Sequence, residues 1–409
     1  MLKQKIINDP LYGFIPIQSD LAFEIIQHPI FQRLRHIGQL GLAHFVYPGA
    51  RHTRFQHALG AYYLMGSALD SLRRKGVEIS EKERESACLA VLLHDIGHGP
   101  FSHSLEETLL PEIKHESLTF LFIQKLNAEF GEALDLAMRI FRNGYHRKFF
   151  HQLVNSQLDV DRLDYLKRDS YFTGVHEGNV GVDRIIDMLN VDGHQLVIEE
   201  KGIYSVENFL TSRRLMYWQV YLHKTSVSAE RLLVNIIRRA KYLATSGEEI
   251  LCTAPLHAFL KSNFILEDFK SHPSALENYG QLDDHDVWGA IKLWKAHRDP
   301  ILANLCKMII DRNLFRIALS SDPISKSKVE RVKEKIMDAY QLLKKDVPYY
   351  FSHGTVSNEA YVAEGQLIKV LSKNGNVIDL AAASDLPQVK ALSKSVKKNF
   401  LCWPKEIEL

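Results

Sequence analysis

The spacing of apolar residues along most of the chain is that of α-helices. In residues 54–74 (RFQHALGAYYLMGSALDSLRR), apolar positions recur every three or four residues, as in an amphipathic helix. Residues 83–95 (ERESACLAVLLHD) are apolar around much of the helix circumference, which predicts a central buried helix that ends at Gly97, Gly99 and Pro100. Further helices are expected at about 116–130, 133–142, 148–154, 159–168, 206–243, 286–296, 299–311 and 324–344.

Two segments depart from this helical pattern and indicate paired strands. Residues 191–204 alternate in polarity and contain a Lys201-Gly202 turn, which predicts a short β-hairpin. Two strands are expected in residues 360–382 around Lys373-Asn374-Gly375-Asn376, because Asn-Gly between apolar runs favours a tight hairpin. We therefore predict a mainly α fold, with a domain of residues 1–317 (helical core at about 19–243) and a small α/β region of residues 318–409.

Composition places this pattern in an ordinary globular protein. Of the 409 residues, 46% are hydrophobic and 24% are charged, and 51 Lys and Arg nearly balance 49 Asp and Glu. This balance does not favour a dedicated nucleic-acid binder. The four cysteines form no CxxC pair, the first residues lack the apolar core of a signal peptide, and no run approaches the ~18 apolar residues of a membrane span. A cytoplasmic protein is expected, without a membrane partner.

The chain has 19 histidines, and several of them lie near aspartates that are expected to be buried. His94-Asp95 follows the buried helix, His57 lies on the preceding helix and Asp161 on a later one. Two imidazoles and two carboxylates suit a borderline divalent ion and leave coordination positions open. The alternative is that backbone groups cap Asp95 at a helix end. His98, His103 and His115 follow closely in the chain, which favours chemistry at this point.

The segment DVDRLDYLKRD (159–169) places four polar side chains at three- and four-residue steps on one helical face: Asp161, Asp164, Tyr165 and Arg168. A solvated helix with ion pairs is the alternative interpretation. That alternative accounts well for Asp164 and Arg168, and poorly for an inward-pointing Asp161.

These motifs resemble the HD superfamily, which is named for its paired His-Asp. The segments GARHTRFQHALG (49–60) and HDIGHGPFSH (94–103) are similar to those of its dNTP triphosphohydrolase branch, which includes the SAM-and-HD-domain dNTPase. Residues 31–41, 159–174 and 220–225 resemble the same branch, whereas no segment resembles a SAM domain. The resemblance implies a helical HD core and hydrolysis of dNTPs to deoxynucleoside and inorganic triphosphate.

The resemblance also implies roles for individual residues. One divalent ion (Mn, Fe, Mg, Co, Ni or Zn) would be bound by His57, His94, Asp95 and Asp161. His115 would protonate the departing sugar oxygen with Glu106 as its partner, and His98 would assist at the α-phosphate. Phosphates would contact His103, Arg54, Arg162 and Arg213, and the nucleoside would contact Gln39, Tyr165, Asp169 and Tyr221.

A regulatory nucleotide is a further implication of the resemblance. A dNTP or GTP effector would bind at Lys5, Asn8, Gln32, Arg35, Arg184, Lys201, His223 and Lys224. Gln27 stands where the SAM-and-HD-domain enzyme has an Asp that reads guanine, so guanine specificity does not follow. The family forms dimers or tetramers, so a homo-oligomer is expected.

Two other functions remain open. Guanosine tetraphosphate hydrolases carry a Glu-Asp pair soon after the HD motif, where this chain has Ile96-Gly97-His98, but another HD phosphohydrolase or phosphodiesterase is still compatible with the sequence. The second alternative is a nucleotide or nucleic-acid sensor without turnover, with the basic segment 390–398 as a place for single-stranded nucleic acid to bind.

Overall fold

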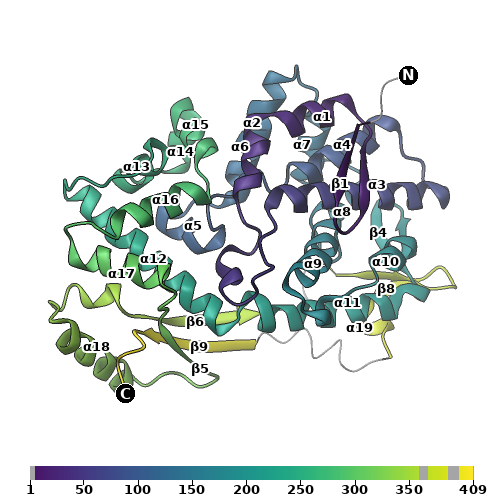
Figure 1. Cartoon of the computed structure of the whole chain (residues 1–409). Helices are drawn as coiled ribbons and strands as arrows, with labels where there is room; N and C mark the ends of the chain where they lie inside the picture. Colours follow the sequence, from purple (N-terminus) through teal and green to yellow (C-terminus); the bar gives the residue numbers. More distant parts are fainter. Residues whose placement is uncertain (1–4, 359–366, 386–395, 409) are drawn as a thin grey trace.

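The computed structural model of the chain describes residues 5–358, 367–385 and 396–408, without the side chain of His103. The fold is mainly α, as the sequence predicts (Figure 1). The helices are α1 Asp20–Gln27, α2 Pro29–Gln32, α3 Arg54–Arg74, α4 Glu81–Leu92, α5 His103–Leu109, α6 His115–Glu129, α7 Asp135–Phe141, α8 Lys148–Val154, α9 Val160–Thr173, α10 Val182–Met188, α11 Ile203–Met216, α12 Lys224–Thr245, α13 Ala254–Lys261, α14 Leu266–Ser271, α15 Pro273–Gln281, α16 Asp284–Trp294, α17 Pro300–Ile310, α18 Lys326–Tyr340 and α19 Leu380–Ala383. The strands are β1 Lys5–Asp9, β2 Gly13–Ile17, β3 Leu189–Asp192, β4 Gln195–Glu199, β5 Arg316–Ser320, β6 Ser352–Asn358, β7 Lys369–Leu371, β8 Val377–Asp379 and β9 Val396–Trp403.

Helix α3 forms the centre of the helical core, with the bounds that the apolar pattern predicts. It packs against α4 and α9, and its Leu64, Met65 and Leu69 are fully buried. Helix α4 ends at Leu92, earlier than expected, so His94 and Asp95 lie in the turn that follows.

Gly97 explains why that turn comes so close to α6. A Cβ at Gly97 would overlap the main chain and side chain at the start of α6, and the Gly97 amide donates a hydrogen bond to Thr119 Oγ1 (3.1 Å). Only glycine fits this approach, so the turn packs directly against α6.

The expected helix at about 206–243 is interrupted. Helix α11 ends at Met216, a π-helical turn spans Tyr217–Tyr221, and α12 begins at Lys224. His223 caps α12 by accepting a hydrogen bond from the Thr225 amide at Nδ1 (3.2 Å). The apolar period continues through the π turn, which is why the sequence suggested one helix; such turns are frequent at functional sites.

Both predicted hairpins form, one with a different turn. Strands β3 and β4 turn at Gly193 (φ +57°), whereas Lys201-Gly202 lies in a 3₁₀ turn before α11, so the expected turn was wrong. Strands β7 and β8 pair around Gly375 (φ +82°), as the Asn-Gly signal predicts.

The C-terminal strands belong to two sheets: β4 and β8 lie at the right of the molecule in Figure 1, and β5, β6 and β9 lie along its lower edge. Strand β7 extends the first hairpin by parallel pairing with β4, and β9 lies between β5 and β6. Strand β5 crosses the predicted domain boundary at 317/318, and that division stays a prediction. Of the basic segment 390–398, residues before Val396 lie outside the described residues. None of the described helices combines the length and apolar character that crossing a membrane requires.

Glu83 anchors the helix that leads to His94. Its carboxylate accepts hydrogen bonds from the Ser80 amide (2.9 Å), from Tyr145 (2.8 Å) and from Arg147 Nη1 (2.7 Å). Burial opposes ionisation, but the Ser80 amide, Arg147 and Tyr145 together lower the pKa of Glu83 to about 2. The ionised carboxylate therefore stabilises the fold at neutral pH.

We predict that Glu83→Gln lowers the free energy of unfolding by about 1–3 kcal/mol at neutral pH. Because the folded-state pKa is depressed, this contribution is present above the unfolded pKa of ~4.3 and is lost as the pH falls towards 2. Urea unfolding of both proteins across this range measures the difference. A constant difference would contradict the ionic origin of the effect.

Candidate functional site

Three elements bring a cluster of potential metal ligands together. His57 comes from α3, His94 from the turn after α4, and Asp161 from the first turn of α9. Asp161 Oδ1 lies 3.0 Å from His57 Nε2 and 3.5 Å from His94 Nε2. One ligand atom from each residue lies within 4.8 Å of the others, which is the separation that a shared ion needs.

In both histidines Nδ1 is hydrogen-bonded away from the cluster, which leaves Nε2 as the nitrogen that faces it. His57 Nδ1 is hydrogen-bonded to Asp164 Oδ2 (2.7 Å), and His94 Nδ1 donates to the Val91 carbonyl (2.5 Å). Both Nε2 atoms are buried and make no hydrogen bond of normal geometry within the described part of the chain. Buried polar atoms normally have a partner. Two imidazole nitrogens so directed beside a carboxylate fit a divalent ion.

Asp164 belongs to a buried chain of charges behind His57. Arg168 Nε donates to Asp164 Oδ2 (2.9 Å), and Arg168 Nη1 donates to Asp9 Oδ2 (2.8 Å). Burial disfavours charge at His57, but the carboxylates of Asp161 and Asp164 raise the pKa of His57 to about 10. The alternative of a solvated helix with ion pairs does not hold for Asp164 and Arg168, because both side chains are fully buried.

Asp95 borders the cluster. Its Oδ1 lies 3.3 Å from His94 Nε2 and 3.3 Å from His98 Nε2, and its Oδ2 contacts Arg54. Burial would raise the pKa of Asp95, but Arg54 and His94 hold it well below the usual range. Arg54 also donates to Ser102 Oγ from Nε (2.9 Å) and Nη2 (2.7 Å), so the guanidinium links α3 to the loop after Asp95.

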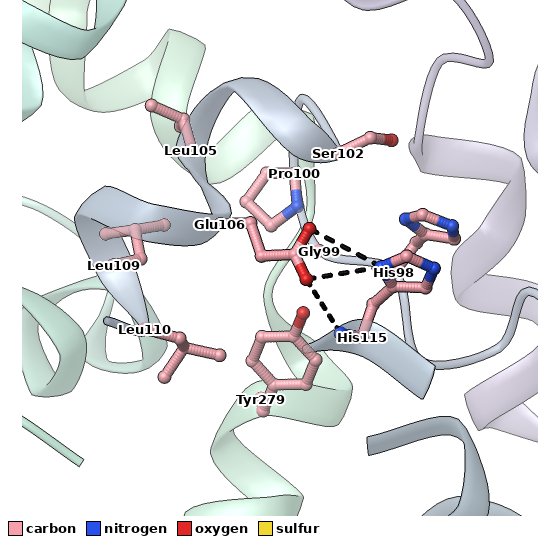
Figure 2. Close-up of a pocket in the computed structure, with 10 residues that line it drawn as sticks. All are labelled: His98, Gly99, Pro100, Ser102, Leu105, Glu106, Leu109, Leu110, His115 and Tyr279. Carbon is pink, nitrogen blue, oxygen red and sulfur yellow. Dashed lines mark hydrogen bonds and ion pairs between the residues drawn. The ribbon is translucent and has the colours of Figure 1, made fainter. Parts of the chain in front are cut away.

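A second group of ionisable side chains lies beside this loop (Figure 2). The His98 and His115 rings stack with centroids 3.8 Å apart. Glu106 Oε1 accepts a hydrogen bond from the His115 amide (2.7 Å) and lies 3.2 Å from His115 Nδ1. Burial and the nearby Arg54 lower the pKa of His98 well below its usual value, so its ring is neutral. The expected role of His103 concerns a side chain outside the described residues.

Among the residues expected to bind a nucleoside, Tyr165 lies near His57 and Tyr221 lies near Tyr165. The Tyr165 ring lies 6.4 Å from the His57 ring and 6.2 Å from the Tyr221 ring. Tyr221 donates to Asp169 Oδ2 (2.8 Å), while Asp169 Oδ1 lies 2.7 Å from His52 Nε2. The sequence reasoning missed His52, whose burial against Asp169 has no local signal.

Three further predicted residues surround this group. The backbone amide of Gln39 donates a hydrogen bond to the His52 carbonyl (3.0 Å), and the side-chain Oε1 of Gln39 is buried. Burial raises the pKa of Tyr165 to about 12 against the opposing charges of Arg162 and Arg213. The two guanidinium groups therefore place positive charge near Tyr165.

The residues proposed for an effector are dispersed over several elements. Lys5 on β1, the strand that also carries Asn8, pairs with Asp20 (3.3 Å), and Arg35 donates to Gln32 (2.8 Å). Arg184 on α10 and Lys201 before α11 are exposed, and His223 and Lys224 form the start of α12. The effector assignment stays a prediction.

Comparison with known proteins places this site in a family. A model described as the HD domain matches residues 54–169, and one described as the HD associated region matches residues 180–251. An uncharacterised Bacillus subtilis protein, YwfO, is 32% identical over 99% of this chain and 93% of its own. The chain belongs to the HD-domain phosphohydrolases. All four predicted metal ligands lie within its HD domain, a kind of domain that binds a divalent metal, and three of them, His57, His94 and Asp161, form the cluster that could hold an ion.

Solved and curated relatives of this HD-domain protein extend the comparison. A crystal structure of a phosphohydrolase from Bacteroides thetaiotaomicron has 47% sequence identity and a TM-score of 0.95, covering 98% of this chain and 100% of that one. The deoxynucleoside triphosphate triphosphohydrolase SAMHD1 homologue of Dictyostelium discoideum is 30% identical over 60% of this chain and 51% of its own length.

Gly60 permits the close packing behind the HD metal site. A Cβ at Gly60 would overlap the Asp164 carboxylate and the Arg168 guanidinium. We predict that Gly60→Ala lowers the free energy of unfolding by roughly 2–4 kcal/mol, because the methyl group displaces a buried ion pair. Gly66→Ala on the same helix is the control, since its Cβ would meet only Arg84 at 3.5 Å. Equal stability of the two variants in chemical denaturation would argue against this packing.

We also predict that Asp164→Asn weakens metal binding by about 10–100-fold, because Asp164 orients the His57 imidazole. Calorimetric titration of chelator-treated protein with Mn²⁺ measures the affinity. Asp70→Asn, which removes a half-exposed carboxylate paired with Arg84, is the control. Unchanged affinity in Asp164→Asn would show that the hydrogen bond does not orient the ligand.

Proposed function

We propose that the chain hydrolyses dNTPs to deoxynucleoside and inorganic triphosphate. The observation that carries the proposal is the pair of buried Nε2 atoms of His57 and His94, which face Asp161 beside the Glu106–His115 pair. A metal position and an acid–base pair side by side are what cleavage of a phosphoester with an alkoxide leaving group requires. The activity named for the SAMHD1 homologue of Dictyostelium discoideum supports deoxynucleoside triphosphates as the substrate class.

His57, His94, Asp95 and Asp161 would hold one divalent ion, with Mn²⁺ as the first choice and Fe, Mg, Co, Ni or Zn as alternatives. When bound, such an ion supplies positive charge that polarises a phosphoester and lowers the pKa of water. Arg54 contacts Asp95, so its guanidinium would lie beside the phosphate group that the ion polarises. Arg162 and Arg213 would add charge-assisted hydrogen bonds to the remaining phosphates.

His115 would donate a proton to the departing sugar oxygen. Its Nδ1 faces Glu106, which orients the ring and leaves Nε2 as the nitrogen that would transfer the proton. The neutral His98 ring stacked on His115 would contact the α-phosphate without adding a competing charge to the pair.

The sugar would be recognised by side chains around the Tyr221–Asp169 hydrogen bond. Asp169 and Gln39 would bind the 3′-hydroxyl, and Tyr165 would pack against the ring where a 2′-hydroxyl would protrude. Tyr221, which lies beside both Tyr165 and Asp169, would contact the base. This arrangement favours deoxynucleotides over ribonucleotides.

We further propose a homo-oligomer, either a dimer or a tetramer, that responds to a dNTP or GTP effector. Support for it comes from the resemblance of the motifs to the dNTP triphosphohydrolase branch. The cytoplasmic location likewise stays a prediction.

The test incubates the protein and Mn²⁺ with each dNTP, alone and in mixtures, and separates the products by chromatography. We expect deoxynucleoside and triphosphate, a rate about 10²–10⁴-fold lower in His115→Gln, and loss of turnover in Asp161→Asn. His176→Gln, at an exposed histidine in the 3₁₀ turn after α9, is the control.

Other products would redirect the proposal. Activity confined to mixtures would support the effector. Orthophosphate would indicate a general HD phosphatase, and nucleotide binding without turnover under any metal would indicate a sensor.

A further inference from the structure

The loop between Asp95 and Ser102 is held by side chains that lie outside both matched family segments. Arg33 donates to the carbonyl oxygens of Ile96 (3.2 Å) and His98 (2.6 Å). Tyr279 donates to the Gly97 carbonyl (3.0 Å). The family segments cover residues 54–169 and 180–251, so Arg33 precedes them and Tyr279 follows them.

Asp284 contributes the most specific of these contacts. Its Oδ1 accepts a hydrogen bond from the Phe101 amide (2.8 Å), and its Oδ2 accepts one from the Gly38 amide (2.9 Å). Gly38 immediately precedes Gln39, and it forms a β-bridge with Thr53 at the start of α3. One carboxylate therefore fastens the loop that carries His98 to the segment that carries Gln39.

Asp284 does not cap its own helix, α16. The cap of α16 is Asp283, whose carboxylate accepts hydrogen bonds from the amides of His285 (2.7 Å) and Asp286 (3.4 Å). Asp284 is the first residue of α16 and directs both oxygens to other segments. Asp283 thus caps the helix, and Asp284 links two other segments. Separate substitutions of the two residues can distinguish these roles.

The main chain beside the Asp284 contact is strained. Phe101 and Ser102 have φ values of +53° and +47°, which residues other than glycine rarely adopt. Such conformations are energetically unfavourable and persist where surrounding contacts hold them. The strained turn directs Ser102 Oγ to Arg54, which contacts Asp95. A fixed Phe101 amide therefore determines where Arg54 and Asp95 lie.

We propose that Asp284 is a positioning residue of the active site. Its carboxylate sets the loop of His98, Ser102 and Phe101 against the Gln39 segment, so that groups on both face one substrate. The inference concerns the geometry of the hydrolytic site and rests on the proposed function only for the identity of the substrate.

The test compares Asp284→Ala and Asp284→Asn with Asp283→Ala, which removes the cap of α16. Hydrogen exchange of peptides containing Gly38 and Phe101 reports the link without any substrate. We expect both amides to exchange roughly 10-fold faster in Asp284→Ala, less so in Asp284→Asn, which keeps one acceptor, and at the wild-type rate in Asp283→Ala. Unchanged exchange in both Asp284 variants would overturn the proposal.

Turnover supplies the second readout. We expect kcat to fall by about 10–100-fold in Asp284→Ala and less in Asp284→Asn, with a smaller change in KM, because misplacement of about 1 Å has effects of this size. Asp283→Ala should lower the Tm and keep kcat within about two-fold, since a lost cap affects stability. An equal loss of kcat in Asp283→Ala would overturn the proposal, because helix stability alone would then explain it.

The assay uses a dNTP that the wild-type protein hydrolyses. If the wild-type protein hydrolyses no dNTP, the assay uses bis(p-nitrophenyl) phosphate. Failure of the dNTPase proposal therefore leaves the two readouts for Asp284 intact. Should Asp284→Ala not fold, Asp284→Asn carries both measurements.

Discussion

The buried ionic chain from Asp161 through His57, Asp164 and Arg168 to Asp9 is the interaction on which the metal centre depends. Three carboxylates in a protein interior repel one another and lose their hydration, so each needs a compensating cation or donor. Arg168 meets that need for two of them at once. His57, whose pKa the carboxylates of Asp161 and Asp164 raise, compensates Asp161, and a divalent ion would take the place of the His57 proton there.

This series of ionic contacts constrains the positions of the helices as strongly as it constrains the potential metal ligands. Its members come from β1, α3 and α9, so the two helices must approach closely enough for His57 to contact two carboxylates of α9. Since the positions of His57 and Asp161 follow from that approach, the same packing that buries the charges also sets the 3.0 Å separation of the ligand atoms.

Sequence reasoning found the features that local patterns encode. The period of 54–74 gave the bounds of α3, and the spacing of His57, His94 and Asp161, with the resemblance of their motifs, indicated the residues that the structure brings together. Patterns could not show that α4 stops at Leu92 or that a π turn follows α11, because the apolar run continues through both. The partnership of Gly38 with Asp284 spans 246 residues, a separation that leaves no local signal.

Such distant contacts bear on how much of the chain makes up the active site. The turn after α4 leaves the carbonyl oxygens of Ile96, Gly97 and His98 outside any helix, and buried backbone groups must be hydrogen-bonded. Arg33 and Tyr279 supply those hydrogen bonds from opposite ends of the HD segment. The matched segment of residues 54–169 contains the histidine–aspartate cluster and the Glu106–His115 pair, whereas α15 and the residues before α3 hold the loop between them in place. Because the geometry of the candidate site depends on both, that site extends beyond the HD domain itself.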